Sequence, residues 1–282
     1  MSASSMRMPS VYEATESGLP PMRQYMRDLR ERRRFIWHLA RTDLKSKNYG
    51  TVIGQSWIIL DPLLSAGVYF FFRSVVKSAG TGATRSLILS HLIWGVFFFT
   101  FTQSSLNYGA RSLVAGRGLI LNASFPRAVL PLVAIVKAIL DFLPTLLIYG
   151  VFHAILGQPF GLSLLGLLLV IPLLTIFNMG VIFIMATANV FFRDTANFLP
   201  YLTRLWLYMT PVLYSIREIP ANLKVYLRWN PLYPFFGALE QIFRAQWPST
   251  GYLLGAAAWA AGFFVVGALI FLAKEREFAV RL

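Results

Sequence analysis

Residues 160–190 read FGLSLLGLLLVIPLLTIFNMGVIFIMATANV and contain no Asp, Glu, Lys or Arg. A helix crosses the hydrocarbon core of a bilayer, about 30 Å thick, with about 20 predominantly apolar residues. This segment exceeds that length. When a helix is longer than the bilayer is thick, it tilts in the membrane or projects from it. The segment therefore predicts a transmembrane helix, and it decides the fold class of the whole chain.

Five other apolar runs lie on either side of this segment. They cover residues 52–76, 86–107, 128–157, 195–216 and 250–273. The run 86–107 also lacks Asp, Glu, Lys and Arg, whereas Lys137 and Asp141 interrupt the run that follows it and Arg204 interrupts the run 195–216. Together the six runs predict an all-α membrane protein with six transmembrane helices in one domain, residues 49–274.

The composition of the chain agrees with this fold class. Of its 282 residues, 56% are hydrophobic and 13% are charged, whereas a soluble domain carries about 25% charged residues. A net charge of +14 is compatible with nucleic-acid binding, but the basic residues flank the apolar runs instead of lining one soluble face. Nucleic acid is therefore not expected as a partner. The chain has no cysteine, which excludes disulfides and thiolate metal sites.

The distribution of Lys and Arg predicts the orientation in the membrane. Most of the 26 basic residues lie before residue 57, in the connections 108–127 and 191–194, or after residue 273. Connections rich in Lys and Arg stay in the cytoplasm, so both termini are expected there. Residues 1–21 show no signal-peptide pattern and are expected to be a disordered cytoplasmic tail, and residues 275–282 a second cytoplasmic tail.

Two amphipathic segments lie outside the six runs. Residues 22–48 carry apolar side chains near helical spacing with arginines between them, which predicts an N-terminal interfacial helix; a solvated basic arm is the alternative. Residues 217–248, between the fifth and sixth spans, contain the helix breaks Pro220 and Asn230-Pro231 and a Glu240–Arg244 pair at i,i+4. They predict an outer re-entrant or interfacial helical hairpin, with a seventh transmembrane helix as the alternative.

No catalytic or metal site is predicted. The three histidines fall in different segments, and no Ser/His/Asp arrangement or pair of carboxylates stands out. The sequence around Gly116-Arg117-Gly118 lacks the GxxxxGK[ST] spacing of a phosphate-binding loop. No cofactor is therefore expected in this chain, and energy for transport would come from a partner or an ion gradient.

Lys137 and Asp141 stand one helical turn apart inside a predicted span, where a lone charge is costly. Together with Arg204 they are compatible with an ion or proton relay, but a structural role is favoured, either as a pair within one helix or as a site near the cytoplasmic end of a long helix. Aromatic side chains near the outer ends of the spans either form a lipid-facing belt or line a passage in which ring faces stack on sugar rings. The candidates for the passage are Tyr69, Phe70, Phe72, Phe98, Tyr208 and Tyr214.

Several motifs occur in an order that resembles a known family. They are residues 41–50 (RTDLKSKNYG), 54–57 (GQSW), 60–63 (LDPL), 110–122 (ARSLVAGRGLILN), 125–126 (FP), 192–194 (FRD) and 230–231 (NP). This combination is similar to the transmembrane permeases of ABC-2-type polysaccharide exporters, which include O-antigen, teichoic acid and capsule exporters. The tail 275–282 (EREFAVRL) is also similar to actinobacterial members that export lipid-linked galactan.

The resemblance implies a bacterial cytoplasmic (inner) membrane protein that forms a homodimer and pairs with two copies of a separate ABC-type ATPase. That ATPase would bind ATP and Mg, and a lipid-linked polysaccharide would pass through a channel at the homodimer interface. The interfacial helix and residues 110–122 would contact the ATPase, the latter as a coupling helix. Its candidate residues are Arg111, Leu113, Val114, Gly116, Arg117, Gly118 and Leu119.

Alternatives to these implications stay open. Residues 110–122 could be an ordinary basic cytoplasmic loop. A drug or small-lipid exporter of the same superfamily is a second function class. A membrane-embedded transferase is a third, although it should show a cluster of Asp, Glu and His residues.

Overall fold

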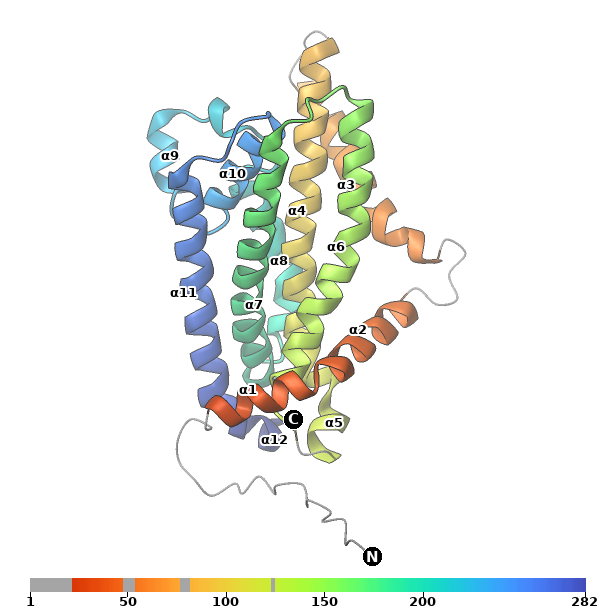
Figure 1. Ribbon diagram of the computed structural model, residues 1–282, viewed down its shortest axis with the longest axis vertical. Coiled ribbons are helices and arrows are strands. Elements are labelled where there is room, and N and C mark those ends of the chain that lie inside the picture. Colours follow the sequence, from red (N-terminus) through yellow and green to blue (C-terminus); the bar gives the residue numbers. More distant parts are fainter. Residues whose placement is uncertain (1–21, 48–53, 77–81, 123–124) are drawn as a thin grey trace, which may run out of the picture.

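The computed structural model describes residues 22–47, 54–76, 82–122 and 125–282. Every regular element in these ranges is a helix, and no strand occurs among them. Long helices stand side by side and form a bundle (Figure 1). Short helices cover its two ends, and the end near the C-terminus is called the base below (Figure 1).

Six helices of the described chain follow the six predicted apolar runs in order. They are α3 (Trp57–Val76), α4 (Gly82–Ala115), α6 (Val129–Ile155), α7 (Leu167–Phe191), α8 (Thr195–Met209) and α11 (Thr250–Lys274). In the described residues, four segments are long and apolar enough to cross a membrane: Ser86–Ala115, Val129–Ile155, Leu162–Phe191 and Thr250–Arg281. The last two include the short 3₁₀ helices η2 (Leu162–Gly166) and η4 (Glu275–Glu277).

Two helices differ in length from their predicted runs. α8 ends at Met209, not at residue 216, because Thr210 has an extended backbone and Pro211 disfavours a helical residue before it. Its 15 residues, at about 1.5 Å each, are too short to cross a hydrocarbon core of about 30 Å. α4 instead continues past residue 107 to Ala115 and includes the first half of the predicted coupling segment.

α7, which comes from the charge-free segment, is the central helix of the bundle. It packs against α4 on one side and α11 on the other, and Leu174, Phe177 and Ile182 are completely buried. Other apolar side chains of α7, such as Leu168, are exposed, as expected for a helix that is apolar on all sides and spans a membrane. α7 and α11 cross at Gly180 and Gly267, where a Cβ atom at either residue would overlap the backbone of the other helix.

The base of the bundle carries four short helices. They are α1 (Met22–Glu31), α2 (Arg33–Lys47), α5 (Arg117–Asn122) and α12 (Phe278–Arg281). α1 lies across the lower ends of the long helices (Figure 1). α2 packs on α6, where Ile36 and Ala40 contact Val129 and Val133. The predicted interfacial segment thus consists of two helices with a turn at Arg32, and both bury residues against the bundle.

The C-terminal residues also pack against the base. Phe278 is completely buried, and its ring lies 5.1 Å from that of Phe271 and 6.5 Å from that of Phe191, measured between centroids. The guanidinium of Arg281 lies 4.4 Å from the centroid of the Phe191 ring. The segment expected to be a tail is therefore folded. The N-terminal residues 1–21 lie outside the described residues.

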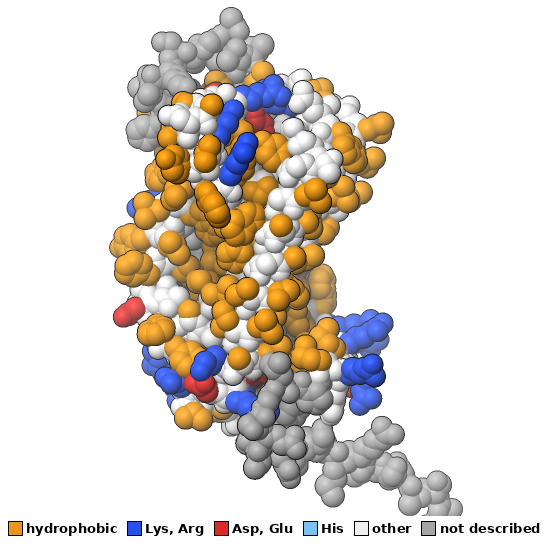
Figure 2. All heavy atoms as spheres, turned by 90° about the vertical axis from the view of Figure 1, so that its left-hand side faces the viewer, with side chains coloured by type: hydrophobic (Ala, Val, Ile, Leu, Met, Phe, Trp, Pro, Cys, Tyr) orange, Lys and Arg blue, Asp and Glu red, His pale blue; other side chains and the backbone are white. Residues whose placement is uncertain are grey.

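The opposite end carries α9 (Ala221–Leu227) and α10 (Tyr233–Phe243), preceded by the 3₁₀ helix η3 (Ile216–Glu218). Pro220 precedes α9, and Asn230-Pro231 separates the two helices, as the sequence predicts. Nearly every residue of α10 is buried against the bundle. Hydrophobic side chains cover the middle of one face of the molecule, with Lys and Arg near its two ends (Figure 2). This distribution is typical of a membrane protein.

Candidate functional site

The predicted coupling segment forms two helices with a break at Gly116. A Cβ atom at Gly116 would overlap the side chain of Leu130, so glycine allows the end of α4 to approach the start of α6. The amides of Leu119 and Ile120 then donate to the carbonyl of Gly116 and begin α5. The segment is therefore not one continuous helix. α5 projects from the base (Figure 1).

The side chains of this segment divide into buried and exposed groups. Leu113 is completely buried and fixes the end of α4 in the core. Arg111, Arg117, Val114 and Leu119 are exposed. Exposed apolar residues beside arginines are common where one protein contacts another. The segment offers such a surface at the base. Gly118, in the middle of this surface, is also exposed and has no side chain.

A basic cluster lies on α1 and α2 at the same end. Arg27, Arg30, Arg33 and Arg34, together with Glu31, surround an open cavity of about 460 Å³. Basic residues at the membrane surface are attracted to the anionic head groups of the cytoplasmic leaflet. The cluster gives the base a strongly basic surface.

The two charges inside α6 contact other helices. Lys137 Nζ lies 3.1 Å from Asp43 Oδ2 of α2 and 4.8 Å from the ring centroid of Tyr108 on α4. Tyr108 donates a hydrogen bond to Asp141. The two charges therefore have structural partners on neighbouring helices and join α6 to α2 and to α4. Arg204 is exposed on α8.

The aromatic residues predicted to line a passage whose side chains the structure describes fall in different surroundings. Phe98 is only 1% exposed, and its ring packs against Phe142 and Phe243 at centroid distances of 5.1 and 6.1 Å. It is a core residue in this arrangement. Phe70 is half-buried on α3, and the side chains of Tyr69 and Phe72 lie outside the described part of the chain.

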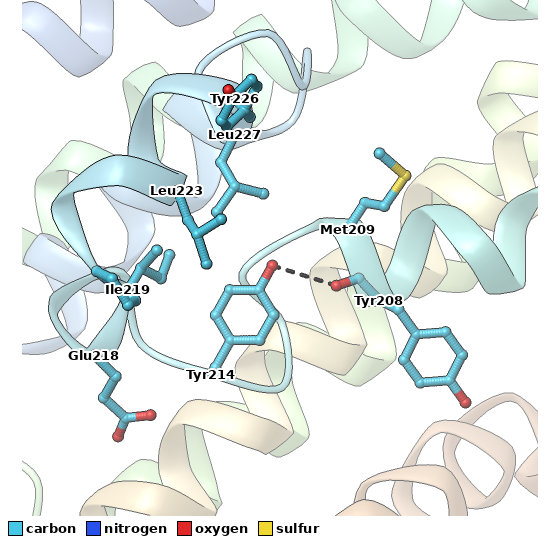
Figure 3. A pocket seen from close by; sticks show the side chains of 9 residues that line it. Tyr208, Met209, Tyr214, Glu218, Ile219, Leu223, Tyr226 and Leu227 are labelled. Atoms are coloured by element: carbon cyan, nitrogen blue, oxygen red, sulfur yellow. Dashed lines mark hydrogen bonds between the residues drawn. The ribbon is translucent and has the colours of Figure 1, made fainter.

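Tyr208 and Tyr214, in contrast, line one pocket at the outer end. The pocket has a volume of about 440 Å³ and lies between the end of α8 and α9. Its wall also includes Met209, Leu223 and Tyr226 (Figure 3). The hydroxyl of Tyr214 donates to the carbonyl of Tyr208 at 3.2 Å, and burial raises the pKa of Tyr214. Aromatic rings with hydroxyl groups at their edges suit a ligand that has both apolar and polar faces.

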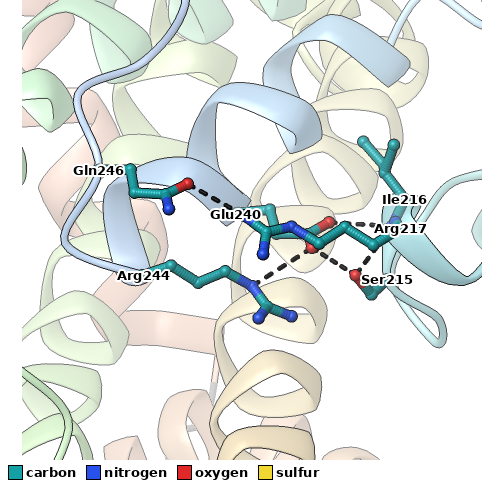
Figure 4. A network of polar contacts seen from close by, with 6 residues as sticks. All are labelled: Ser215, Ile216, Arg217, Glu240, Arg244 and Gln246. Atoms are coloured by element: carbon teal, nitrogen blue, oxygen red, sulfur yellow. Dashed lines mark hydrogen bonds and ion pairs between the residues drawn. The ribbon is translucent and has the colours of Figure 1, made fainter.

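A buried carboxylate fixes the turn that follows Tyr214. Glu240 of α10 accepts hydrogen bonds from the hydroxyl of Ser215 and, at 2.9 Å, from the amide of Ile216 (Figure 4). Arg244 Nε lies 3.4 Å from Glu240, which confirms the pair predicted from their spacing. The contacts to Ser215 and Ile216 were not predicted, because a carboxylate that binds a distant turn leaves no local pattern in the sequence.

Comparison with known proteins gives the family. The family model for the ABC-2 type transporter matches residues 23–243. The chain belongs to the ABC-2 type transporter family. An O-antigen export system permease protein RfbA from Klebsiella pneumoniae is 32% identical over 196 residues, which cover 69% of this chain and 74% of that protein. The protein of the same name from Myxococcus xanthus is 28% identical over 265 residues, 92% of this chain and 99% of that protein.

Membership of this family fits the arrangement described above. The chain is a multi-pass membrane permease of the ABC-2 type, and permeases of this type pair with an ATPase subunit. The matched range includes both the exposed segment at the base and the helices at the outer end.

Proposed function

We propose that this permease is the membrane subunit of an exporter that moves a lipid-linked polysaccharide across the bacterial cytoplasmic membrane. A separate ATPase, with its bound ATP and Mg, would act on the base. The similarity to O-antigen export permeases carries this proposal, because one of them aligns with 92% of this chain and 99% of its own length.

In the proposed topology the permease has six membrane segments and both termini in the cytoplasm. α3 and α8 join the four longer helices as membrane segments, although α8 does not reach across the bilayer by itself. The connection from Thr210 to Ser215 continues from α8 toward α9 at the outer end. Arg27, Arg30 and the other arginines of the basic cluster support the base as the cytoplasmic side.

The pathway is proposed to lie between two copies of the permease. Tyr201, Arg204 and Tyr208 recur at helical spacing on α8, and all three are exposed. An arginine that faced lipid near the centre of the bilayer would cost at least about 2.5–3.5 kcal/mol. This face of α8 therefore suits a surface covered by protein or water better than a lipid-facing one. Exposed tyrosine rings on it would stack on passing sugar rings.

The direct test is deletion of the gene with an inducible copy to maintain growth. Depletion should remove a polysaccharide from the cell surface and cause its lipid-linked form to accumulate inside the cell. Export should return with the wild-type permease, but not when the phosphate-binding lysine of the partner ATPase is replaced.

Other results would support the other function classes. Unchanged surface polysaccharide together with altered drug resistance or lipid composition would indicate a drug or small-lipid exporter. Incomplete polysaccharide without an accumulated lipid-linked form would indicate a transferase.

A further inference from the structure

One buried carboxylate at the base, at the end of α11, contacts two distant parts of the chain, α1 and the start of α6. The Tyr25 hydroxyl donates its one proton to the carboxylate of Glu275, which follows α11, and lies 3.0 and 2.9 Å from the two carboxylate oxygens. The amide of Arg127, just before α6, donates to the same carboxylate at 2.7 Å, and its guanidinium donates to the Glu275 carbonyl. The amide of Ala128 in turn lies 3.4 Å from the Tyr25 hydroxyl, to which it donates. These four residues are called the Glu275 cluster.

The Glu275 cluster is buried. Glu275 is 8% exposed, and Tyr25 and Ala128 are nearly inaccessible. A buried carboxylate is costly unless hydrogen-bond donors surround it, and here a hydroxyl and a backbone amide fill that role. If either donor is lost, the buried carboxylate of Glu275 lacks a hydrogen bond. The cluster therefore strongly favours the arrangement in which α1 lies against the base.

Packing on both sides fixes the position of Glu275 itself. On one side it continues directly from α11, which runs the length of the bundle and packs against α10 at the outer end. On the other side it precedes Phe278, which is held between Phe271 and Phe191. The Glu275 carboxylate, at the end of α11 and fixed by packing in the core, therefore opposes a displacement of α1.

We propose that Glu275 is a positioning residue of the transport cycle, through which α1, the start of α6 and α11 move as one unit. This inference rests on the proposed function, since a partner ATPase acting on the base is what would displace α1. A movement imposed on α1 would then reach α11, and through the contact of α11 with α10 it would reach the outer end. Without the Glu275 cluster, α1 would move while the bundle stayed in place.

The first experiment needs no substrate and no partner. Amide hydrogen exchange is measured on the full-length permease in nanodiscs for wild type, Tyr25→Phe and Glu275→Ala, which removes the acceptor altogether. Glu277→Ala is the matched control, because Glu277 is more exposed and, among the described residues, pairs with its neighbours Lys274 and Arg281. Exchange in residues 22–31 should rise about tenfold or more in the first two variants and not in the control.

Exchange in α4 and α7 should stay unchanged in all variants, which separates loosening of α1 from general unfolding. Unchanged exchange in residues 22–31 of both Tyr25→Phe and Glu275→Ala would overturn the inference. That result would leave the proposed function untouched, since it concerns only how α1 is held.

The second experiment uses the permease reconstituted with its ATPase. ATP turnover by Tyr25→Phe should stay within about twofold of wild type, whereas polysaccharide transported per ATP should fall about fivefold. A Tyr25→Cys/Glu275→Cys pair joined by a short bis-maleimide should regain coupling relative to the same protein before joining. Normal transport per ATP in Tyr25→Phe, or no gain on joining, contradicts the inference. A wild-type complex that hydrolyses ATP but moves no polysaccharide contradicts the proposed function instead.

Discussion

Two glycines determine how closely α7 and α11 approach. Because a Cβ atom at Gly180 would overlap the backbone of Phe263, no side-chain rotation relieves the contact. Gly180→Ala is therefore expected to destabilise the permease by about 1–3 kcal/mol, the usual effect of overpacking. The measurement is thermal unfolding followed by size-exclusion chromatography in detergent. Gly262→Ala on α11 is the control, since a Cβ atom there meets no atom within 4 Å. Equal changes in unfolding temperature in the two variants would show that the crossing of α7 and α11 is not tight.

The buried carboxylate of Glu240 holds the turn at Ser215 and Ile216 closed. Glu240→Ala removes the acceptor for Ser215 and Ile216 and leaves Arg244 without its partner, so a loss of about 3–5 kcal/mol is expected if the turn stays closed. The turn should instead open, and trypsin should then cleave faster after the already exposed Arg217, because cleavage needs a locally unfolded backbone. Glu240→Gln keeps an acceptor oxygen and should open the turn much less. Equal cleavage of wild type and Glu240→Ala would show that the turn is held by other contacts.

The sequence predicted residue contacts only where they are local. The pair Glu240–Arg244 follows from i,i+4 spacing on one helix, and it forms. Lys137 and Asp141 have the same spacing, and the structure joins Lys137 to Asp43 on α2 and Asp141 to Tyr108 on α4, contacts that their spacing does not indicate. The spacing of two residues along one helix does not show which residue of another helix they contact. The burial of Phe98 was missed for the same reason, since hydropathy does not distinguish a core face from a lipid face.

At the scale of elements, the order of the helices was predictable and their ends were not. Apolar runs long enough to span a membrane predicted the positions of α4, α6, α7 and α11, because such runs are recognised from the local composition alone. The end of α8 depends on the local effect of Pro211. α4 continues beyond its apolar run through residues that include Arg111, so hydropathy placed its end several residues too early.

The exposed part of the coupling segment gives a prediction for α5 and the end of α4. Arg111→Glu together with Arg117→Glu should leave membrane insertion and thermal stability unchanged, because both side chains are exposed. The double variant should lower stimulation of the partner ATPase and export about tenfold or more, since reversed charges oppose the contact. Arg228→Glu, exposed at the outer end, is the matched control. Normal export by the double variant would show that this segment is an ordinary loop.

The whole molecule presents two kinds of exposed surface along its length. On α6, Leu147 and Val151 are exposed and aliphatic, as expected for side chains in contact with lipid. On α8, exposed Tyr201 and Tyr208 accompany exposed Arg204, which lipid does not favour. A second copy related by two-fold symmetry would cover the α8 face with the same face of its partner, because such an interface is self-complementary.

Single cysteines distinguish these two surfaces, because the chain has none of its own. In a two-fold dimer, residues near the axis lie close to their own counterparts in the other copy. Phe198→Cys and Leu205→Cys on α8 should therefore cross-link between copies in native membranes, and the cross-link should block export until it is reduced. Leu147→Cys and Val151→Cys on α6 are the controls and should stay monomeric on denaturing gels. Cross-linking at α6 but not at α8, or export by a permease that remains a monomer, would place the pathway away from the α8 face.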